Sequence, residues 1–299
     1  MKSPPALVSR IDHLTIRIDD ARYDQLFAAF AETLGLPVAW PVAERYPNQQ
    51  LGFKSGGIAA GNINLEIFRA GVVAPPQAQL YSIAFEPARP LEQSLQALDA
   101  RGIPHLPPLA VPQDVFGEVG KLWTLVMLGD LLGADLSRFP PLQRGATGHS
   151  VLALRFDEAL RAGMVFLCAY NTALYDPAAE REKKQAELQA TQGGPLGFVQ
   201  VREVVVGAMN LAPAHAHWYR LLDPWPVTPL PLRWQLSEGP TIRLVPAPHD
   251  GVLALVWQVA SLERAAAFLR ERGLLGSRSA QHIAVDPAAL LGVEVRLVE

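Results

Sequence analysis

The clearest pattern in the chain is the alternation of apolar and polar side chains in two short stretches near its start. In residues 10–19, three aliphatic residues alternate with polar residues that include His13. Residues 62–68 alternate in the same way and place Glu66 on the polar side. Alternation with a period of two predicts strands that bury one face. Each predicted strand therefore has an apolar back and a mixed front that carries one side chain able to bind a metal or move a proton.

The segment between these strands predicts a helix followed by two more strands. Residues 21–35 carry apolar side chains every three or four positions and end at Gly35, as expected of a helix that packs on a sheet. Residues 36–43 and 50–60 are strand-like, with turn residues between them. The first 70 residues therefore predict the order β-α-β-β-β.

The same order of elements recurs along the chain. In the second unit, the predicted strands cover residues 80–86, 120–128, 150–156 and 164–170, and a helix covers 90–102. The third unit combines strands at 199–206, 232–236 and 241–245 with a helix at 212–222, and the fourth combines strands at 252–259, 281–285 and 293–298 with a helix at 261–273. Repetition of this kind predicts an α+β fold made of four βαβββ modules in two pairs.

A change in composition separates the two pairs. Residues 176–192 are rich in Glu, Lys, Gln and Ala, which favours a solvated helix, and two glycines and a proline follow at 193–195. We therefore expect a first module pair at 1–175, a helical linker at 176–197 and a second, shorter pair at 198–299.

The composition excludes several kinds of partner. The 299 residues are 49% hydrophobic and carry a net charge of −3, and no basic patch is present of the kind that nucleic-acid binding needs. A single cysteine, Cys168, excludes an internal disulfide. The chain lacks both a run of about 20 apolar residues and a recognisable signal peptide, so we expect a cytoplasmic protein without a membrane span.

Three stretches resemble the glyoxalase/bleomycin-resistance/dioxygenase superfamily, also called the vicinal oxygen chelate superfamily. They are Ile11–Ile16, Asn64–Phe68 and the C-terminal Val285–Glu299. The resemblance implies paired βαβββ modules whose mixed sheets curl into cups. It also implies that, in members that use a metal, the first and last strands of each module supply ligands to a divalent ion that binds oxygens of the substrate.

In the first unit, His13 and Glu66 match the metal-binding positions of this pattern. The corresponding positions of the other three units hold Ser82 and Cys168, Glu203 and Arg243, and Ala254 and Arg296. A histidine nitrogen and a glutamate oxygen suit Zn, Fe, Mn, Ni or Co. The same pair can also act as a catalytic acid–base couple without a metal, and the residues leave both interpretations open.

The resemblance implies a protein that acts on a small organic molecule in the cup of the first pair. Trp123, Cys168 and Tyr170 are candidate walls of that cup, although Cys168 also suits a buried core position. Lyase, isomerase and dioxygenase chemistry all remain open, and the alternative is a metal-free protein that binds or sequesters a small molecule, as resistance proteins do. Because each cup is complete within one chain, a monomer or a homodimer is expected.

Overall fold

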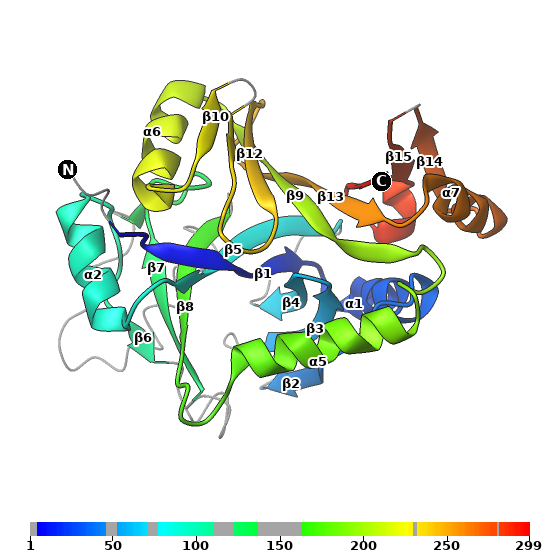
Figure 1. The fold of residues 1–299 in the computed structure, drawn as a ribbon, viewed down its shortest axis with the longest axis horizontal. Coiled ribbons are helices and arrows are strands. Elements are labelled where there is room, and N and C mark those ends of the chain that lie inside the picture. Colours follow the sequence, from blue (N-terminus) through cyan, green and yellow to red (C-terminus); the bar gives the residue numbers. More distant parts are fainter. Residues whose placement is uncertain are drawn as a thin grey trace.

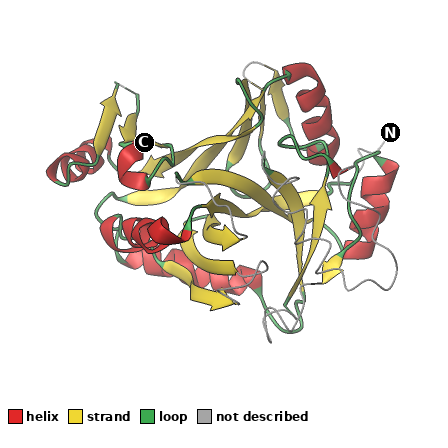
Figure 2. Ribbon diagram, turned by 180° about the vertical axis from the view of Figure 1, so that it is seen from behind, coloured by secondary structure: helices red, strands yellow, loops and turns green. Residues whose placement is uncertain are grey.

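The computed structural model describes residues 5–45, 53–70, 77–110, 122–136, 163–229, 232–279 and 281–299. Within these residues the chain forms two eight-stranded mixed sheets, with helices at the periphery (Figure 1). Figure 2 shows the same two sheets from behind, one built from each half of the chain. The predicted α+β class is therefore confirmed.

The first module follows the predicted order. Its elements are β1 (Val8–Arg17), α1 (Asp20–Ala28), a π-helical turn η1 (Ala29–Thr33), β2 (Val38–Arg45), β3 (Phe53–Ala60) and β4 (Ile63–Ala70). The Asp19 carboxylate accepts a hydrogen bond from the Arg22 amide and so caps α1. Leu26 on α1 and Phe30 on η1 are buried, as the apolar spacing predicts, whereas Phe27, which the same spacing places on this stripe, is only partly buried. Tyr23 is buried beside them.

The second module differs from the prediction at one strand. Its elements are β5 (Gln79–Pro87), α2 (Leu91–Ala100), β6 (Leu109–Ala110), β7 (Trp123–Leu128) and β8 (Met164–Tyr170). The two-residue strand β6 lies between the predicted helix at 90–102 and the predicted strand at 120–128, where the sequence predicts no strand. The strand expected at 150–156 lies outside the described residues.

The second half of the chain repeats the order with shorter strands. The third module contains β9 (Phe198–Ala208), α6 (Leu211–Leu222), β10 (Val227–Pro229), β11 (Leu232–Trp234) and β12 (Thr241–Pro246). The fourth contains β13 (Gly251–Val259), α7 (Leu262–Glu271), β14 (Leu275–Arg278), β15 (Ile283–Val285), a 3-10 turn η4 (Pro287–Leu290) and β16 (Val295–Val298). The short strands β10 and β14 were not predicted, and both lie at an edge of their sheet.

Both sheets have the same internal arrangement. The strand orders are β2-β3-β4-β1-β5-β8-β7-β6 and β10-β11-β12-β9-β13-β16-β15-β14. In each sheet the first strands of the two modules are antiparallel neighbours at the centre, and each pairs in parallel with the last strand of its own module. Side chains from β1, β4, β5 and β8 therefore meet on one face at the middle of the first sheet.

The predicted linker contains helix α5 (Pro177–Ala190), which starts at Asp176 as the side-chain cap. Figure 1 shows α5 running across the first sheet, in front of β2 and β3. Leu188 is buried on its inner side. Helix α5 therefore covers part of the first sheet in addition to connecting the two halves. The division at 176–197 stays a prediction, because one continuous hydrophobic core includes residues of both sheets.

The two halves approach each other closely at the turn between β3 and β4. The side-chain NH₂ group of Asn62 donates to the carbonyl oxygen of Val201 at 2.9 Å, and the side-chain oxygen of Asn62 accepts from the backbone N–H of Val201 at 3.1 Å. Gly61 precedes this contact with φ +67°, and a Cβ atom on it would lie 2.7 Å from the carbonyl oxygen of Val199. A side chain at position 61 is therefore opposed both by the backbone conformation and by the neighbouring sheet.

We predict that Gly61→Ala destabilises the protein more than Gly273→Ala does. Gly273 has φ +68° and nothing within 4 Å of the added Cβ atom, so it isolates the conformational cost, which is about 1 kcal/mol. Gly61→Ala adds a steric cost of about 1–3 kcal/mol. Urea unfolding of the two variants measures the difference. An equal decrease in the free energy of unfolding in both variants would show that the two halves are not packed together at this turn.

Candidate functional site

Strands β1 and β4 bring His13 and Glu66 together on the front face of the first sheet. In their parallel register His13 lies beside Asn64 and Thr15 lies beside Glu66. The Nε2 atom of His13 is 3.6 Å from Oε2 of Glu66. His13 is 8% exposed, and the Glu66 side chain is 19% exposed, so His13 is buried and Glu66 is partly buried.

A third residue, Asp12, belongs to the site because of a β-bulge. The register of β1 against β5 shifts between Ile11 and His13, which makes Asp12 the extra residue of the bulged strand. Strict alternation assigns Asp12 to the opposite face from His13. In the structure an Asp12 oxygen, Oδ2, instead lies 2.6 Å from Nδ1 of His13. The sequence signal that points to this exception is a carboxylate at a position where alternation predicts an apolar side chain.

Two further side chains hold Asp12 in place. The hydroxyl of Tyr170 donates to Oδ2 of Asp12 at 2.8 Å, and the guanidinium of Arg181 lies 3.8 Å from Oδ1. Burial alone would raise the pKa of Asp12, but the hydrogen bonds from His13 and Tyr170 and the charge of Arg181 hold it below its usual value. Burial and the charge of Asp12 raise the pKa of Tyr170 well above its usual value, so the phenol stays protonated and donates.

Glu66 is oriented by hydroxyl groups on the neighbouring strands. Ser55 on β3 donates to Oε1 at 2.6 Å, and Thr15 on β1 donates to Oε2 at 3.2 Å. The indole of Trp40 on β2 in turn donates to the Ser55 hydroxyl at 3.3 Å. These bonds fix the carboxylate with one oxygen directed to His13.

The hydrogen bonds determine which nitrogen of His13 is available for chemistry. An ionised carboxylate only accepts hydrogen bonds, so Nδ1 of His13 donates to Asp12, and Nε2 is left on the side of Glu66. Burial lowers the pKa of His13, but the hydrogen bond and charge of Asp12 and the charge of Glu66 outweigh burial and raise it. His13 is therefore suited to hold and release a proton at Nε2.

The expected wall residues come together on β7 and β8. Cys168 is buried in a cluster with Phe166, and Trp123 and Tyr170 pack against this cluster. The ring of Phe166, which alternation along the strand places on the same face as Cys168 and Tyr170, lies edge-on 5.5 Å from the ring of His13. Burial raises the pKa of the Cys168 thiol well above its usual value, which fits its interpretation as a small hydrophobic residue.

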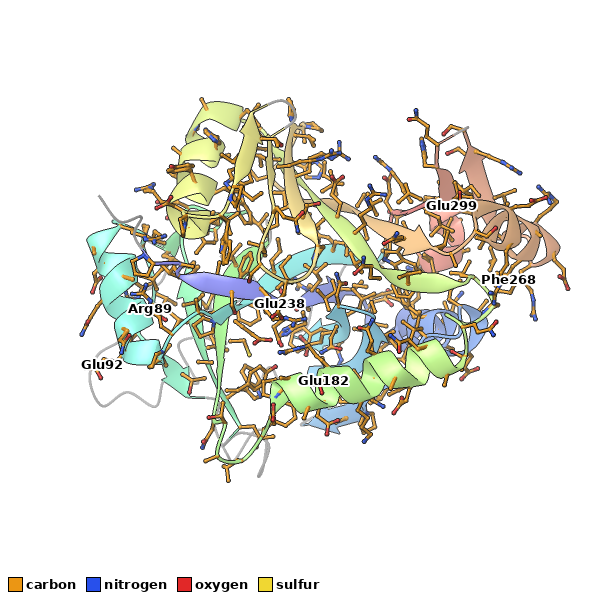
Figure 3. All side chains as sticks on the ribbon, in the orientation of Figure 1. Arg89, Glu92, Glu182, Glu238, Phe268 and Glu299 are labelled. Atoms are coloured by element: carbon orange, nitrogen blue, oxygen red, sulfur yellow. The ribbon has the colours of Figure 1, made fainter. Side chains whose placement is uncertain are left out.

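A buried ion-pair network connects this site to helix α5 and to the second half of the chain. Arg181 on α5 makes a close ion pair with Glu86 on β5, and Arg10 Nε lies 3.6 Å from the same carboxylate. Arg10 also bonds Glu238, which Figure 3 shows near β1, at 2.7 Å. Burial and the nearby charge of Asp12 raise the pKa of Glu86 to about 7, although Arg181 and Arg10 act in the opposite direction.

This network predicts a decrease in stability as the pH rises. Glu86 has an ordinary pKa of 4.5 and a pKa of about 7 in the folded protein. Its contribution to the free energy of unfolding is therefore fully present below pH 4.5 and is lost as the pH rises through about 7. The raised pKa of His13 acts in the same direction. We expect the free energy of unfolding to fall by on the order of 3 kcal/mol between about pH 5 and pH 8.

Urea unfolding of the wild type and of Glu86→Gln across this pH range provides the test. The substitution removes the ionisable group, so the decrease should become smaller. Glu187→Gln is the matched control, because Glu187 pairs with Lys184 on the exposed side of α5 and should leave the pH dependence unchanged. A stability that rises from pH 5 to pH 8 in the wild type would contradict the role of Glu86.

The donor set at His13 and Glu66 does not match a complete metal chelate. Among the described residues, no group of three or more His, Cys, Asp and Glu side chains is arranged to hold a metal ion. The opposite wall presents Ala84, Phe166 and Cys168, of which the first two carry no donor atom. His13 and Glu66 therefore supply only part of a ligand set.

The corresponding place in the second sheet holds a structural ion-pair cluster. Glu203 on β9 binds Nε of Arg243 at 2.6 Å and Nε of Arg233 at 2.8 Å. Arg296 pairs with Glu294 at 3.0 Å. These arginines pair with carboxylates, and their positive charge makes this sheet unsuitable for a cation.

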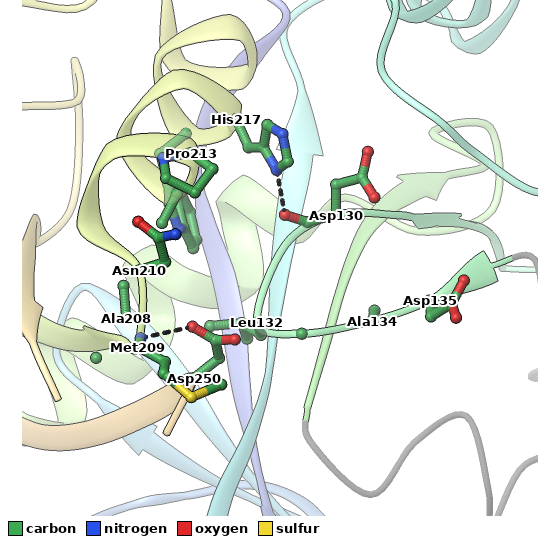
Figure 4. Close-up of a pocket in the computed structure, with 14 residues that line it drawn as sticks. Asp130, Leu132, Ala134, Asp135, Ala208, Met209, Asn210, Pro213, His217 and Asp250 are labelled. Carbon is green, nitrogen blue, oxygen red and sulfur yellow. Dashed lines mark hydrogen bonds between the residues drawn. The ribbon is translucent and has the colours of Figure 1, made fainter. Parts of the chain in front are cut away.

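A cavity of about 290 Å³ lies at a different place, between the loop after β7 and the start of α6 (Figure 4). His217 bonds the carbonyl of Asp130 at 2.7 Å across it, and Asp250 accepts from the amide of Met209 at 3.0 Å. His13 and Glu66 are not among the residues that line it. This cavity is therefore separate from the predicted site.

Comparison with solved structures identifies the fold. The 2,3-dioxygenase LapB from Pseudomonas sp. KL28 matches with a TM-score of 0.57 at 11% identity, over 98% of this chain and 92% of that chain. The Mn(II)-bound glyoxalase from Novosphingobium aromaticivorans matches with a TM-score of 0.57 at 13% identity, over 98% and 82%. A hypothetical protein from Staphylococcus aureus matches with a TM-score of 0.58 at 11% identity, over 97% and 99%.

These matches confirm the predicted resemblance at the level of the fold. The chain has the paired-module fold of the matched dioxygenase and glyoxalase structures. No protein-family model and no curated protein matches the sequence. In the part of the chain that the structure describes, no helix combines the length and apolar character that a membrane crossing requires.

Proposed function

We propose that the protein is an enzyme that moves a proton on a small organic molecule bound at the front face of the first sheet. The observation that carries this proposal is the position of His13 between two carboxylates, with Asp12 on Nδ1 and Glu66 3.6 Å from Nε2. A buried histidine oriented by a carboxylate is a common general acid–base unit. The fold supports the proposal, because glyoxalases and dioxygenases with the same architecture act on small molecules.

Each residue of the site has a distinct part in this chemistry. Asp12 keeps the proton on Nδ1, so His13 takes and returns protons only at Nε2. Glu66 is the second group within reach of the same substrate hydrogen, and a pair of groups allows a proton to leave one atom and return to another. The ring of Phe166 lies beside His13 and limits access of water.

The geometry favours isomerase or lyase chemistry on a molecule whose C–H bond is acidified by a neighbouring carbonyl. His13 and Glu66 can remove a proton from carbon and redeliver it, and this transfer needs no oxidant. Dioxygenase chemistry requires a metal that activates oxygen, for which the described donors are incomplete. The binding of Zn, Fe, Mn, Ni or Co by His13 and Glu66 is a separate hypothesis, which the Mn(II)-bound glyoxalase among the structural matches supports.

A proton-exchange experiment tests the proposal. A panel of small hydroxy- and keto-carbonyl compounds is incubated with the protein in D₂O, and C–H to C–D exchange is followed by proton NMR. We expect exchange in at least one compound. His13→Gln and Glu66→Gln should slow it by about 100-fold or more while the fold is retained.

His217→Gln is the matched control, because His217 is a hydrogen-bonded histidine that lines the separate cavity. Its exchange rate should equal that of the wild type. A compound that raises the melting temperature without any exchange would favour the alternative, a protein that binds or sequesters the molecule. Exchange that is unchanged in both site variants would exclude His13 and Glu66 as the reacting groups.

A further inference from the structure

The front face of the first sheet also contains a buried hydroxyl group, that of Ser82 on β5. Ser82 is 1% exposed, and within the described part of the chain its hydroxyl has no hydrogen-bond partner. A hydroxyl that is removed from water without a partner destabilises the folded state, and such groups are uncommon in folded proteins. A ligand that supplies a partner would offset this cost.

Ser82 lies on the same face as His13 because both central strands contain a bulge. The pairing of β1 with β5 shifts register at Asp12 on β1 and at Tyr81 on β5. His13 directly follows the first bulge, and Ser82 directly follows the second. In this register Ser82 is opposite Thr15, and opposite residues of an antiparallel pair share one face. Because His13 and Thr15 are two residues apart on β1, all three side chains lie on the front face.

This position places Ser82 beside the reacting pair of the proposed function. Its opposite neighbour, Thr15, donates to Oε2 of Glu66, which is the oxygen that lies 3.6 Å from Nε2 of His13. His13 is itself opposite Ala84, so His13 and Ser82 are diagonal neighbours. The Cα atoms of diagonal neighbours are about 7–8 Å apart, which is a distance that one small molecule can bridge.

We propose that the hydroxyl of Ser82 binds the carbonyl oxygen of the substrate whose C–H bond His13 and Glu66 act on. The inference rests on the proposed function and adds to it the group that holds the substrate oxygen.

The spacing of the three groups suits a carbonyl compound. A group that moves a proton acts within about 3 Å of it, and a hydroxyl donates a hydrogen bond over a similar distance. The diagonal from His13 to Ser82 therefore matches an acidic carbon followed by the oxygen of the adjacent carbonyl. The substrate class is a small aldehyde, ketone or acyl compound with a hydrogen on the neighbouring carbon.

The proton and electrons balance without a further reactant. The proton of the C–H bond passes to Nε2 of His13, and the electron pair of that bond forms a C=C bond. The π electrons of the carbonyl move to its oxygen, which accepts the hydrogen bond from Ser82 as it becomes negative. Return of the proton reverses these changes. A donor already in place for such an oxygen increases the rate by about 100-fold.

The variant Ser82→Ala tests the inference, with Ser94→Ala as the matched control. Ser94 on α2 is also fully buried, but its hydroxyl donates to the carbonyl of Arg89 at 3.2 Å. Ser82→Ala should slow C–H to C–D exchange of the fastest panel compound by about 100-fold, and urea unfolding should show an unchanged or higher folding equilibrium constant. Ser94→Ala should leave exchange unchanged and lower that constant by about fivefold.

Two results would overturn the inference. One is a Ser82→Ala variant that exchanges as fast as the wild type. The other is a Ser82→Ala variant that loses as much stability as Ser94→Ala, because the hydroxyl would then have a structural partner.

A binding measurement separates this inference from the proposed function. If the wild type exchanges no compound, the proposed function fails, and calorimetry is performed with the panel compound that most raises the melting temperature. Ser82→Ala should then weaken binding of that compound by about tenfold, because one hydrogen bond to it is lost. An unchanged affinity would contradict the assignment of Ser82.

Discussion

The hydrogen bond between Asp12 and His13 is the interaction on which the site depends. It exists because β1 contains a bulge at Asp12, which places two consecutive side chains on one side of the sheet. Without the bulge, Asp12 would be directed into the apolar core, where an unpaired carboxylate is costly. With it, the carboxylate is hydrogen-bonded, and it leaves Nε2 as the one reactive nitrogen of His13.

Asp12 in turn depends on parts of the chain that are distant in sequence. Tyr170 comes from β8, and Arg181 comes from the helix that connects the two halves. Arg10 extends the same network to Glu238 in the second half. The second half of the chain, in which the central carboxylate is neutralised by arginines, therefore contacts the network around Asp12 through Glu238.

The sequence predicts the modules and the shared face of His13 and Glu66, because both follow from the burial of apolar side chains. Alternation identifies which face of β1 and β4 is apolar, so His13 and Glu66 were assigned correctly to one face. Alternation alone does not predict the bulge at Asp12, because one inserted residue reverses the alternation locally, and the only sequence signal is a carboxylate at an expected apolar position. Strands of three or four residues, such as β10 and β14, are too short to show a period.

The central claim is that Asp12 holds a proton on Nδ1 of His13. Two-bond proton–nitrogen correlation NMR on protein labelled with ¹⁵N-histidine measures this directly, with His13→Gln used to assign the signal. We predict that Nδ1 of His13 is protonated across the neutral pH range and that Asp12→Ala removes this preference. A neutral His13 ring with its proton on Nε2 and an unprotonated Nδ1 would contradict the account.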